Sequence, residues 1–281
     1  MNKNMSKRDK ITLAIFIFIT ITAGLFGYLL DQVLTEQPEG NSLGMGLWLV
    51  LPFLTGIVLG IFNKDMKQIG FHPHFKNNFK WYAVAFLAFP VITIISVIAS
   101  KIAGALTIQE IELTVLSGLM ITAFFSSFIK NIFEEFAWRG FLFSYLEKTR
   151  MNDWLLYFLN GLIWGSWHIT YYMFFLPDEY FTKISRPMMV IAGIVLMIFW
   201  SPLFVELRRL TKSAWPCVIL HSMEDAVPTM LFVTANVLQI KEYYSIMLDP
   251  IQGVLSVALI FFTGLVLKKY RIKKEAVVTK K

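Results

Sequence analysis

Ionisable side chains stand inside apolar stretches of this sequence. Glu134, Glu135 and Arg139 lie in one such stretch, and His168 and His221 lie in two others. An ionisable group within a membrane span is costly unless it is paired or lines a wet cavity, so such groups mark functional sites. Carboxylates and imidazoles together favour either acid–base activation of a water molecule or the binding of a divalent metal.

Spacing within a helix predicts which of these groups share a face. Residues four apart are neighbours on a helix, so Glu135 is expected to pair with Arg139 and His221 to lie beside Asp225. Glu134 is then the second carboxylate of its helix, about 100° round the axis from Glu135.

Two states of Glu134 stay open at this point. Burial would favour its protonated form and suit it to act as a general base. An ion pair with Lys130, four residues earlier, would instead hold it ionised.

The composition predicts the environment of these groups. Of 281 residues, 56% are hydrophobic and only 16% are charged, and the mean hydropathy is +0.60. This is too apolar for a soluble domain and predicts an all-α, polytopic membrane protein. The net charge of +7 comes from clusters beside apolar spans, so no nucleic-acid partner is expected. The single cysteine, Cys217, excludes an intrachain disulfide.

Apolar runs of roughly 17 to 25 residues predict about eight transmembrane helices in one integral membrane domain, 1–281. They lie near 11–30, 43–62, 81–100, 116–145, 154–176, 188–207, 214–236 and 250–267. The first run is too long for a signal peptide and is expected to be retained. The catalytic core is expected within 116–236.

Charge in the loops predicts the orientation. With the N-terminus inside, about 20 Lys and Arg residues fall on the inner side and about 4 outside, which predicts that both termini are cytoplasmic. At a rise of 1.5 Å per residue, Glu134, His168 and Asp225 then lie roughly 16 to 21 Å from the inner ends of their helices. Three helices are therefore expected to bring reactive groups to one layer.

Simpler explanations exist for each group taken alone. Glu135 and Arg139 suit a structural ion pair, and a single histidine suits a hydrogen bond between helices. Trp164 suits packing. The conjunction of two Glu, two His and an Asp at similar depth exceeds what packing requires, and therefore predicts an active site.

Two other groups are weaker candidates. His72 and His74 suit a small metal site, but the lysines around them favour contact with lipid headgroups. Cys217 stands one turn before His221, which permits a Cys–His nucleophile, although a lone cysteine in a span usually fills apolar space.

Three motifs resemble those of the CAAX-protease and bacteriocin-processing (Abi) family of intramembrane proteases, which includes the type II CAAX prenyl endopeptidases. The matching residues are Glu134-Glu135-x-x-x-Arg139-Gly140, Trp164-x-x-x-His168 with Trp in place of Phe, and His221-x-x-x-Asp225. The motifs occur in the family's order, each in a separate predicted span.

The resemblance implies an all-helical membrane protease whose active site opens to the cytoplasm. It implies that Glu134 and His168 activate water, that His221 and Asp225 stabilise the oxyanion, and that the following motif residues support the site: Glu135 and Arg139. An ionised Asp225 would repel an oxyanion, so this variant requires either a protonated Asp225 or another role, such as orienting His221.

The residues permit two mechanisms and several partners. Glu134, His168, His221 and Asp225 suit one divalent metal such as Zn²⁺, and equally a metal-free Glu–His pair. The expected partners are the lipid bilayer and a peptide or membrane-protein substrate, in a bacterial plasma membrane. The alternatives are a non-catalytic membrane regulator or bacteriocin immunity protein of the same fold, and a transporter in which buried acids and histidines relay protons.

Overall fold

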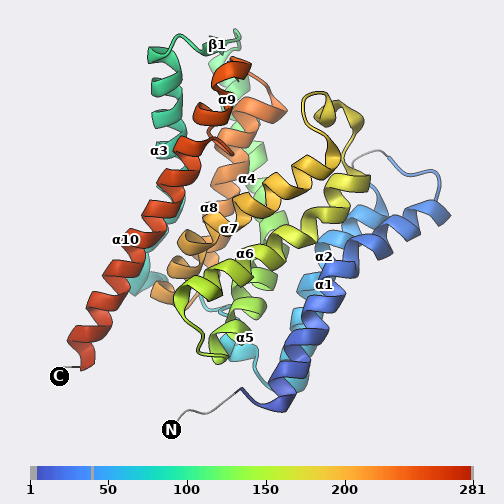
Figure 1. Ribbon diagram of the computed structural model, residues 1–281, viewed down its shortest axis with the longest axis vertical. Coiled ribbons are helices and arrows are strands. Elements are labelled where there is room, and N and C mark those ends of the chain that lie inside the picture. The colour runs from blue at the N-terminus through green and yellow to red at the C-terminus, as the bar shows by residue number, and fades with distance from the viewer. Residues whose placement is uncertain (1–4, 39–40, 280–281) are drawn as a thin grey trace. The chain divides into compact units, whose positions relative to one another are not determined.

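The computed structural model describes residues 5–38 and 41–279, and this part of the chain is nearly all helical (Figure 1). Its α-helices are α1 (Lys7–Val33), α2 (Leu43–Asn63), α3 (Phe75–Ile102), α4 (Leu113–Glu135), α5 (Phe143–Lys148), α6 (Asp153–Thr170), α7 (Arg186–Thr211), α8 (Trp215–Glu224), α9 (Glu242–Leu248) and α10 (Val254–Thr279). Tighter 3₁₀ turns form η1 (Met66–Gln68) and η4 (Asp178–Phe181), and wider π-helical segments form η2 (Phe136–Leu142), η3 (Tyr171–Phe175) and η5 (Asp225–Thr234).

A small sheet departs from the all-α prediction. Strands β1 (Leu106–Ile108) and β2 (Leu238–Ile240) pair antiparallel, with Leu106 opposite Ile240. Each strand has only three residues, too few for the period-two pattern that identifies a strand in a sequence.

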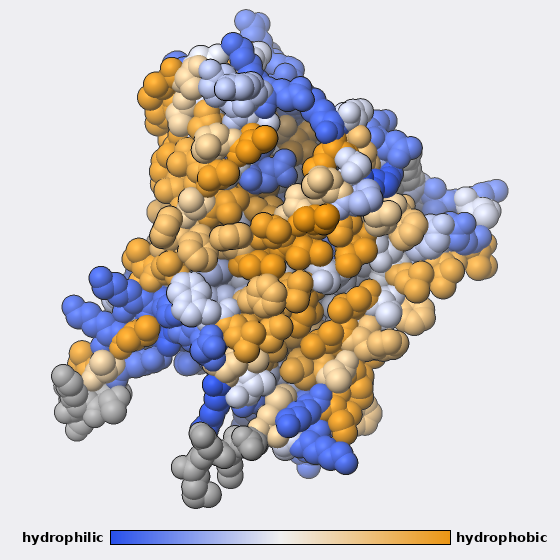
Figure 2. All heavy atoms as spheres, in the orientation of Figure 1, coloured by the Kyte–Doolittle hydropathy of each residue, from blue (hydrophilic) through white to orange (hydrophobic). Residues whose placement is uncertain are grey.

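The multi-pass membrane character is confirmed. Among the described residues, six helical segments are long and apolar enough to cross a membrane: α1, α2, α3, Leu113–Lys148, α7 and Trp215–Thr234. Large apolar side chains also face outward, including Phe18 and Ile102, and Figure 2 shows apolar residues spread over the helices on the face it draws. A soluble monomer rarely exposes apolar surface so widely.

Two of the eight predicted spans do not meet these criteria. The run 154–176 covers α6 and η3, and the 18 residues of α6 include Asp153, Asn160 and His168. The run 250–267 coincides with α10, whose apolar part leads directly into Lys268 and Lys269. The count of eight spans therefore stays a prediction, as does the orientation of the termini.

The chain divides into two compact units. Unit 1 comprises residues up to 71 together with 133–201, and unit 2 comprises 72–132 together with the residues from 202 onward. Helices α4 and α7 contribute residues to both.

Unit 1 is built on close helix contacts. A Cβ atom at Gly161 would lie 2.5 Å from the Ile198 Cα, and one at Gly165 would lie 2.7 Å from the Ile194 Cα. Two glycines four residues apart thus let α6 lie against the backbone of α7, as small residues do at membrane helix interfaces. This contact fixes the helix that carries His168.

Tryptophans join α6 to α2 in the same unit. The rings of Trp48 and Trp167 stack with centroids 3.9 Å apart. Each indole N–H donates to the other residue's carbonyl oxygen, at 3.1 Å from Trp48 and 3.3 Å from Trp167. Both buried N–H groups thereby gain the acceptors that a buried polar group needs.

Unit 2 packs α8 and α10 against α3, with α10 alongside α3 in Figure 1. The Ser96 and Ser256 hydroxyls lie 2.7 Å apart and join α3 to α10. The buried Glu206 carboxylate accepts two hydrogen bonds from Arg271, at 2.6 and 3.0 Å, which joins α10 to α7. A bidentate guanidinium–carboxylate pair fixes orientation as well as distance.

Candidate active site

All three motif helices change from α to π geometry at or beside their motif. Helix α4 ends at Glu135 and continues as η2, α6 gives way to η3 two residues after His168, and α8 gives way to η5 at Asp225. A π-helical turn is wider than an α turn, is rare, and occurs frequently at functional sites. In η5 the ring of Pro228 removes one backbone donor from the regular α pattern.

The predicted ion pair between Glu135 and Arg139 is present in unit 1. The Arg139 Nη1 donates to both carboxylate oxygens of Glu135, at 2.9 and 3.1 Å, and both side chains are fully buried. Taking two charges out of water is costly and is offset only when their geometry is good. This pair therefore suits the positioning role that the motif resemblance implies for it.

Trp164 contributes more than packing. Its ring lies beneath the guanidinium of Arg139, with the arginine Cζ 3.9 Å from the ring centroid. This is a cation–π contact within a fully buried setting, where such contacts are strongest. The first and second motifs are thus joined through Arg139 and Trp164.

The imidazole of His168 is held by its own helix. Its Nδ1 lies 3.0 Å from the carbonyl oxygen of Trp164, one turn earlier. A carbonyl only accepts hydrogen bonds, so Nδ1 carries the hydrogen and Nε2 is the basic nitrogen of the neutral ring. The ring also stacks on Tyr172, with centroids 5.6 Å apart. His168 is thereby set in the form that a general base requires.

Glu134 lies one residue before the end of α4 in unit 1 and is 4% exposed. The backbone just beyond it is fixed by a close approach, because a Cβ atom at Gly140 would lie 2.9 Å from Ile69 Cγ2. The Ser144 hydroxyl donates to the Gln68 carbonyl at 2.7 Å in the same region. Close packing therefore explains why a glycine stands at position 140 of the first motif.

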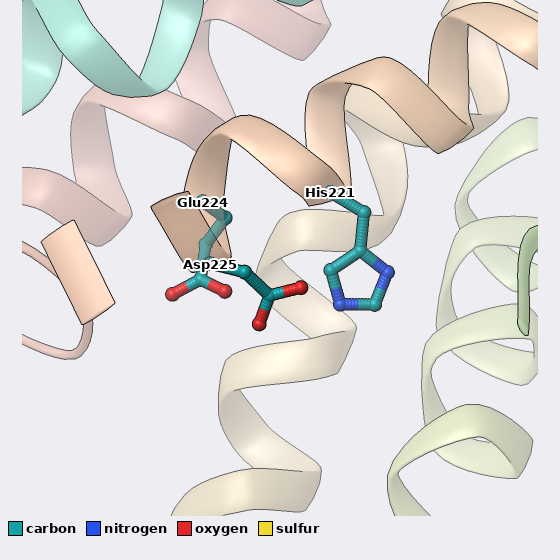
Figure 3. Close-up of side chains that lie close together, drawn as sticks. All are labelled: His221, Glu224 and Asp225. Carbon is teal, nitrogen blue, oxygen red and sulfur yellow. The ribbon is translucent and has the colours of Figure 1, made fainter. Parts of the chain in front are cut away.

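Unit 2 brings together His221, Glu224 and Asp225. One potential ligand atom from each lies within 4.8 Å of the others. Figure 3 shows the three side chains close together, with the Asp225 carboxylate between the other two residues. Glu224 and His221 are buried, and the Thr229 hydroxyl donates to Glu224 Oε1 at 2.6 Å.

Asp225 is held by a cation and an amide. The Lys130 Nζ lies 3.1 Å from Oδ2 and 3.3 Å from Oδ1 of Asp225. The Asn131 amide donates to Oδ2 at 2.8 Å. Donors of this kind favour the ionised carboxylate, so the arrangement favours the orienting role for Asp225 over that of a protonated oxyanion donor.

The fit of a divalent metal to unit 2 is mixed. An imidazole and two carboxylates are ligands that zinc accepts. However, the Lys130 ammonium already contacts both oxygens of Asp225 and would repel a second cation there. As arranged, Asp225 does not suit a metal, and the chemistry proposed below proceeds without one.

Cys217 does not suit the nucleophile considered in the sequence. It is fully buried, and its thiol donates to the Phe204 carbonyl at 3.3 Å. This is the environment of a small apolar side chain, and a reactive cysteine needs exposure.

Each unit thus carries part of the predicted set. Glu134, Glu135, Arg139 and His168 lie in unit 1, and His221 and Asp225 lie in unit 2. Sequence reasoning did not include Glu224 in the predicted site, and it did not connect Lys130 or Asn131 with Asp225. Glu224 had a signal, since it stands three residues after His221, on the same helix face.

Comparison with known families gives a match over the region that contains the motifs. Residues 116–227 match the family model described as "Type II CAAX prenyl endopeptidase Rce1-like", a family of proteases. The matched region contains all three motifs. No curated protein matches the chain. The family match confirms the resemblance drawn from the motifs: residues 116–227 carry the pattern of the Rce1-like type II CAAX prenyl endopeptidases.

Proposed function

We propose that this protein is an intramembrane endopeptidase that hydrolyses a peptide bond of a membrane-associated peptide or protein. The observation that carries the proposal is the setting of His168, whose Nδ1 is held by the Trp164 carbonyl so that Nε2 is basic. A buried imidazole just before a π-helical segment is suited to acid–base chemistry. The family match over residues 116–227 supports the same reaction class.

In the proposed reaction, Glu134 and His168 remove a proton from a water molecule as its oxygen attacks the scissile carbonyl. The carbonyl oxygen becomes an oxyanion, and the proton then passes to the leaving amine as the C–N bond breaks. Glu135 and Arg139 hold the helix of the first motif in place.

His221 is the proposed oxyanion donor. The Asp225 carboxylate lies close to the His221 imidazole (Figure 3), so it is suited to fix the orientation of that ring. Asp225 itself acts by orienting His221. We assign all three motifs to one reaction because they occur in the family's order within the matched region, residues 116–227.

The proposed membrane arrangement has eight spans with both termini in the cytoplasm, and cleavage occurs on that side. The excess of Lys and Arg in the loops of one side supports this orientation. The apolar, lysine-rich composition favours a bacterial plasma membrane.

The test is cleavage of a peptide library by detergent-purified protein, comparing the wild type with Glu134→Gln and His168→Ala. Removing one acid–base group is expected to lower the rate about 100-fold or more. Matched controls make the same chemical changes at exposed positions, Glu112→Gln and His72→Ala, and should cleave like the wild type.

Two further arms sharpen the result. Chelator and added Zn²⁺ leave a metal-free enzyme unchanged, whereas loss of activity with chelator would establish a metal mechanism. If folded Glu134→Gln and His168→Ala proteins cleave as fast as their controls, the catalytic assignment is wrong, and the non-catalytic regulator becomes the better explanation.

A further inference from the structure

A groove of 580 Å³ lies in unit 2 between α3 and α10, away from the motif residues. Its walls include Ala83, Leu87, Ala88 and Val91 from α3, and Leu259 and Thr263 from α10. The two alanines leave a hollow between larger side chains. Because almost every lining side chain is apolar, the groove suits a hydrocarbon chain and not a polar ligand.

The two helices are joined at both ends of this groove. At one end the Ser96 and Ser256 hydroxyls lie 2.7 Å apart. At the other end the Lys80 Nζ donates to the Tyr270 hydroxyl at 2.6 Å, and Trp81 meets Tyr270 edge to face with centroids 4.9 Å apart. The groove therefore lies between two contacts that hold α3 and α10 together.

The length of the groove suits a lipid chain. Lys80 and Ser96 are sixteen positions apart on α3, which corresponds to about 24 Å of helix. One leaflet contributes about 15 Å of hydrocarbon, half of a core about 30 Å thick. A chain lying in the groove can thus pass through a whole leaflet.

One end of the groove is cationic. The Lys80 ammonium lies over the rings of Trp81 and Tyr270, 4.6 and 4.4 Å from their centroids. Within the described chain, Tyr270 is the one hydrogen-bond acceptor of Lys80 Nζ, so an ammonium with three donors can also bind an anionic oxygen.

Neighbouring residues extend this positive charge. Lys76 precedes Lys80 by one turn of α3, and Lys269 and Lys273 flank Tyr270 on α10. Figure 2 shows hydrophilic side chains gathered round the C-terminal end of α10. Arg271, next to Tyr270, is paired with two acids, Glu206 at 2.6 Å and Glu275 at 3.3 Å. An apolar channel that ends in cations is complementary to an acidic phospholipid.

We propose that the groove between α3 and α10 is a binding site for one acidic phospholipid, with an acyl chain along Ala83 to Val91 and its phosphate at Lys80. The lipid completes the contact between the two helices and stabilises unit 2. This site is separate from the proposed protease chemistry and stands whether or not the protein cleaves peptides.

The test is native mass spectrometry of the full-length protein in micelles that contain equal amounts of palmitoyl-oleoyl phosphatidylglycerol and phosphatidylcholine. The wild type is expected to retain one phosphatidylglycerol in preference to phosphatidylcholine. Lys80→Gln is expected to lower phosphatidylglycerol retention about fivefold, the effect of one cation near a lipid surface, and to leave phosphatidylcholine unchanged. Ala83→Phe fills the groove and is expected to remove both lipids.

Matched controls separate the site from general effects. Lys67→Gln removes the same charge from η1 in unit 1, and Ile94→Phe adds a ring on α3 at a position that is 57% exposed and outside the groove. Both should bind like the wild type. If Ala83→Phe does not fold, Ala88→Leu narrows the same groove. Equal retention of the two lipids by the wild type, or equal binding by Lys80→Gln and Lys67→Gln, would overturn the proposal.

Discussion

The two units hold their ionisable groups in opposite ways. In unit 1 the Glu135–Arg139 pair is fully buried and covered by the ring of Trp164. In unit 2 the pair of Lys130 and Asp225 is partly open, with side-chain exposures of 38% and 17%. The ion pair of unit 1 is therefore shielded from solvent, whereas the ion pair of unit 2 is partly exposed to it.

The difference in exposure suits the two ion pairs to different roles. A fully buried pair cannot exchange protons with water readily, and its removal is costly, which suits a scaffold. A partly exposed pair is screened and can rearrange, which suits groups that meet a substrate. In the proposed mechanism, Glu135 and Arg139 would position the first motif, while Lys130 and Asn131 would hold Asp225 beside His221.

The largest expected effect is in unit 1. Arg139→Gln leaves the buried Glu135 carboxylate without its guanidinium, and is expected to lower the free energy of unfolding by about 3 to 5 kcal/mol. Denaturant unfolding of the protein in detergent measures this loss. Under purification the variant is expected to be poorly folded.

A second variant checks that the cost comes from the unpaired charge. Glu135→Gln combined with Arg139→Gln removes both charges and should be more stable than Arg139→Gln alone. A double variant that is less stable than the single one would show that the pair is not the source of the effect.

Much of this arrangement follows from sequence and some of it does not. The Glu135–Arg139 pair was predictable because residues four apart on a helix are neighbours. The contacts of Asp225 were not predictable, because its partners Lys130 and Asn131 are more than ninety residues earlier in the chain. Only tertiary packing brings such groups together.

The helical fold shows the same limit. Long apolar runs identify α1, α2, α3 and α7 directly, since a membrane span needs about 20 apolar residues. The π-helical segments left no comparable signal, because a single wide turn barely alters the spacing of apolar residues. The π-helical segments lie at or beside the motifs, and departures from regular α-helix are expected at functional sites.

A smaller effect is expected in unit 2. Lys130→Met removes a charged hydrogen bond to Asp225, and partial access of water limits the expected loss to about 1.5 kcal/mol. Adding Asp225→Asn removes the remaining charge and should recover part of the stability. Thermal unfolding of both variants measures this. If Lys130→Met is as destabilising as Arg139→Gln, the buried Glu135–Arg139 pair does not contribute more to stability than the partly exposed Lys130–Asp225 pair, and the comparison is wrong.

The smallest effect on stability is expected for Trp164, whose ring lies against the buried Glu135–Arg139 pair. Trp164→Phe keeps an apolar ring, and Phe is the residue of the related motif, but it weakens the cation–π contact with Arg139. The expected loss is about 0.5 to 1 kcal/mol of unfolding free energy. Trp154→Phe makes the same change at an exposed position of the same helix and should have no effect. In an Arg139→Gln background the loss from Trp164→Phe should largely disappear, because the cation that it contacts is gone. An undiminished loss in that background would mean that Trp164 acts through packing alone.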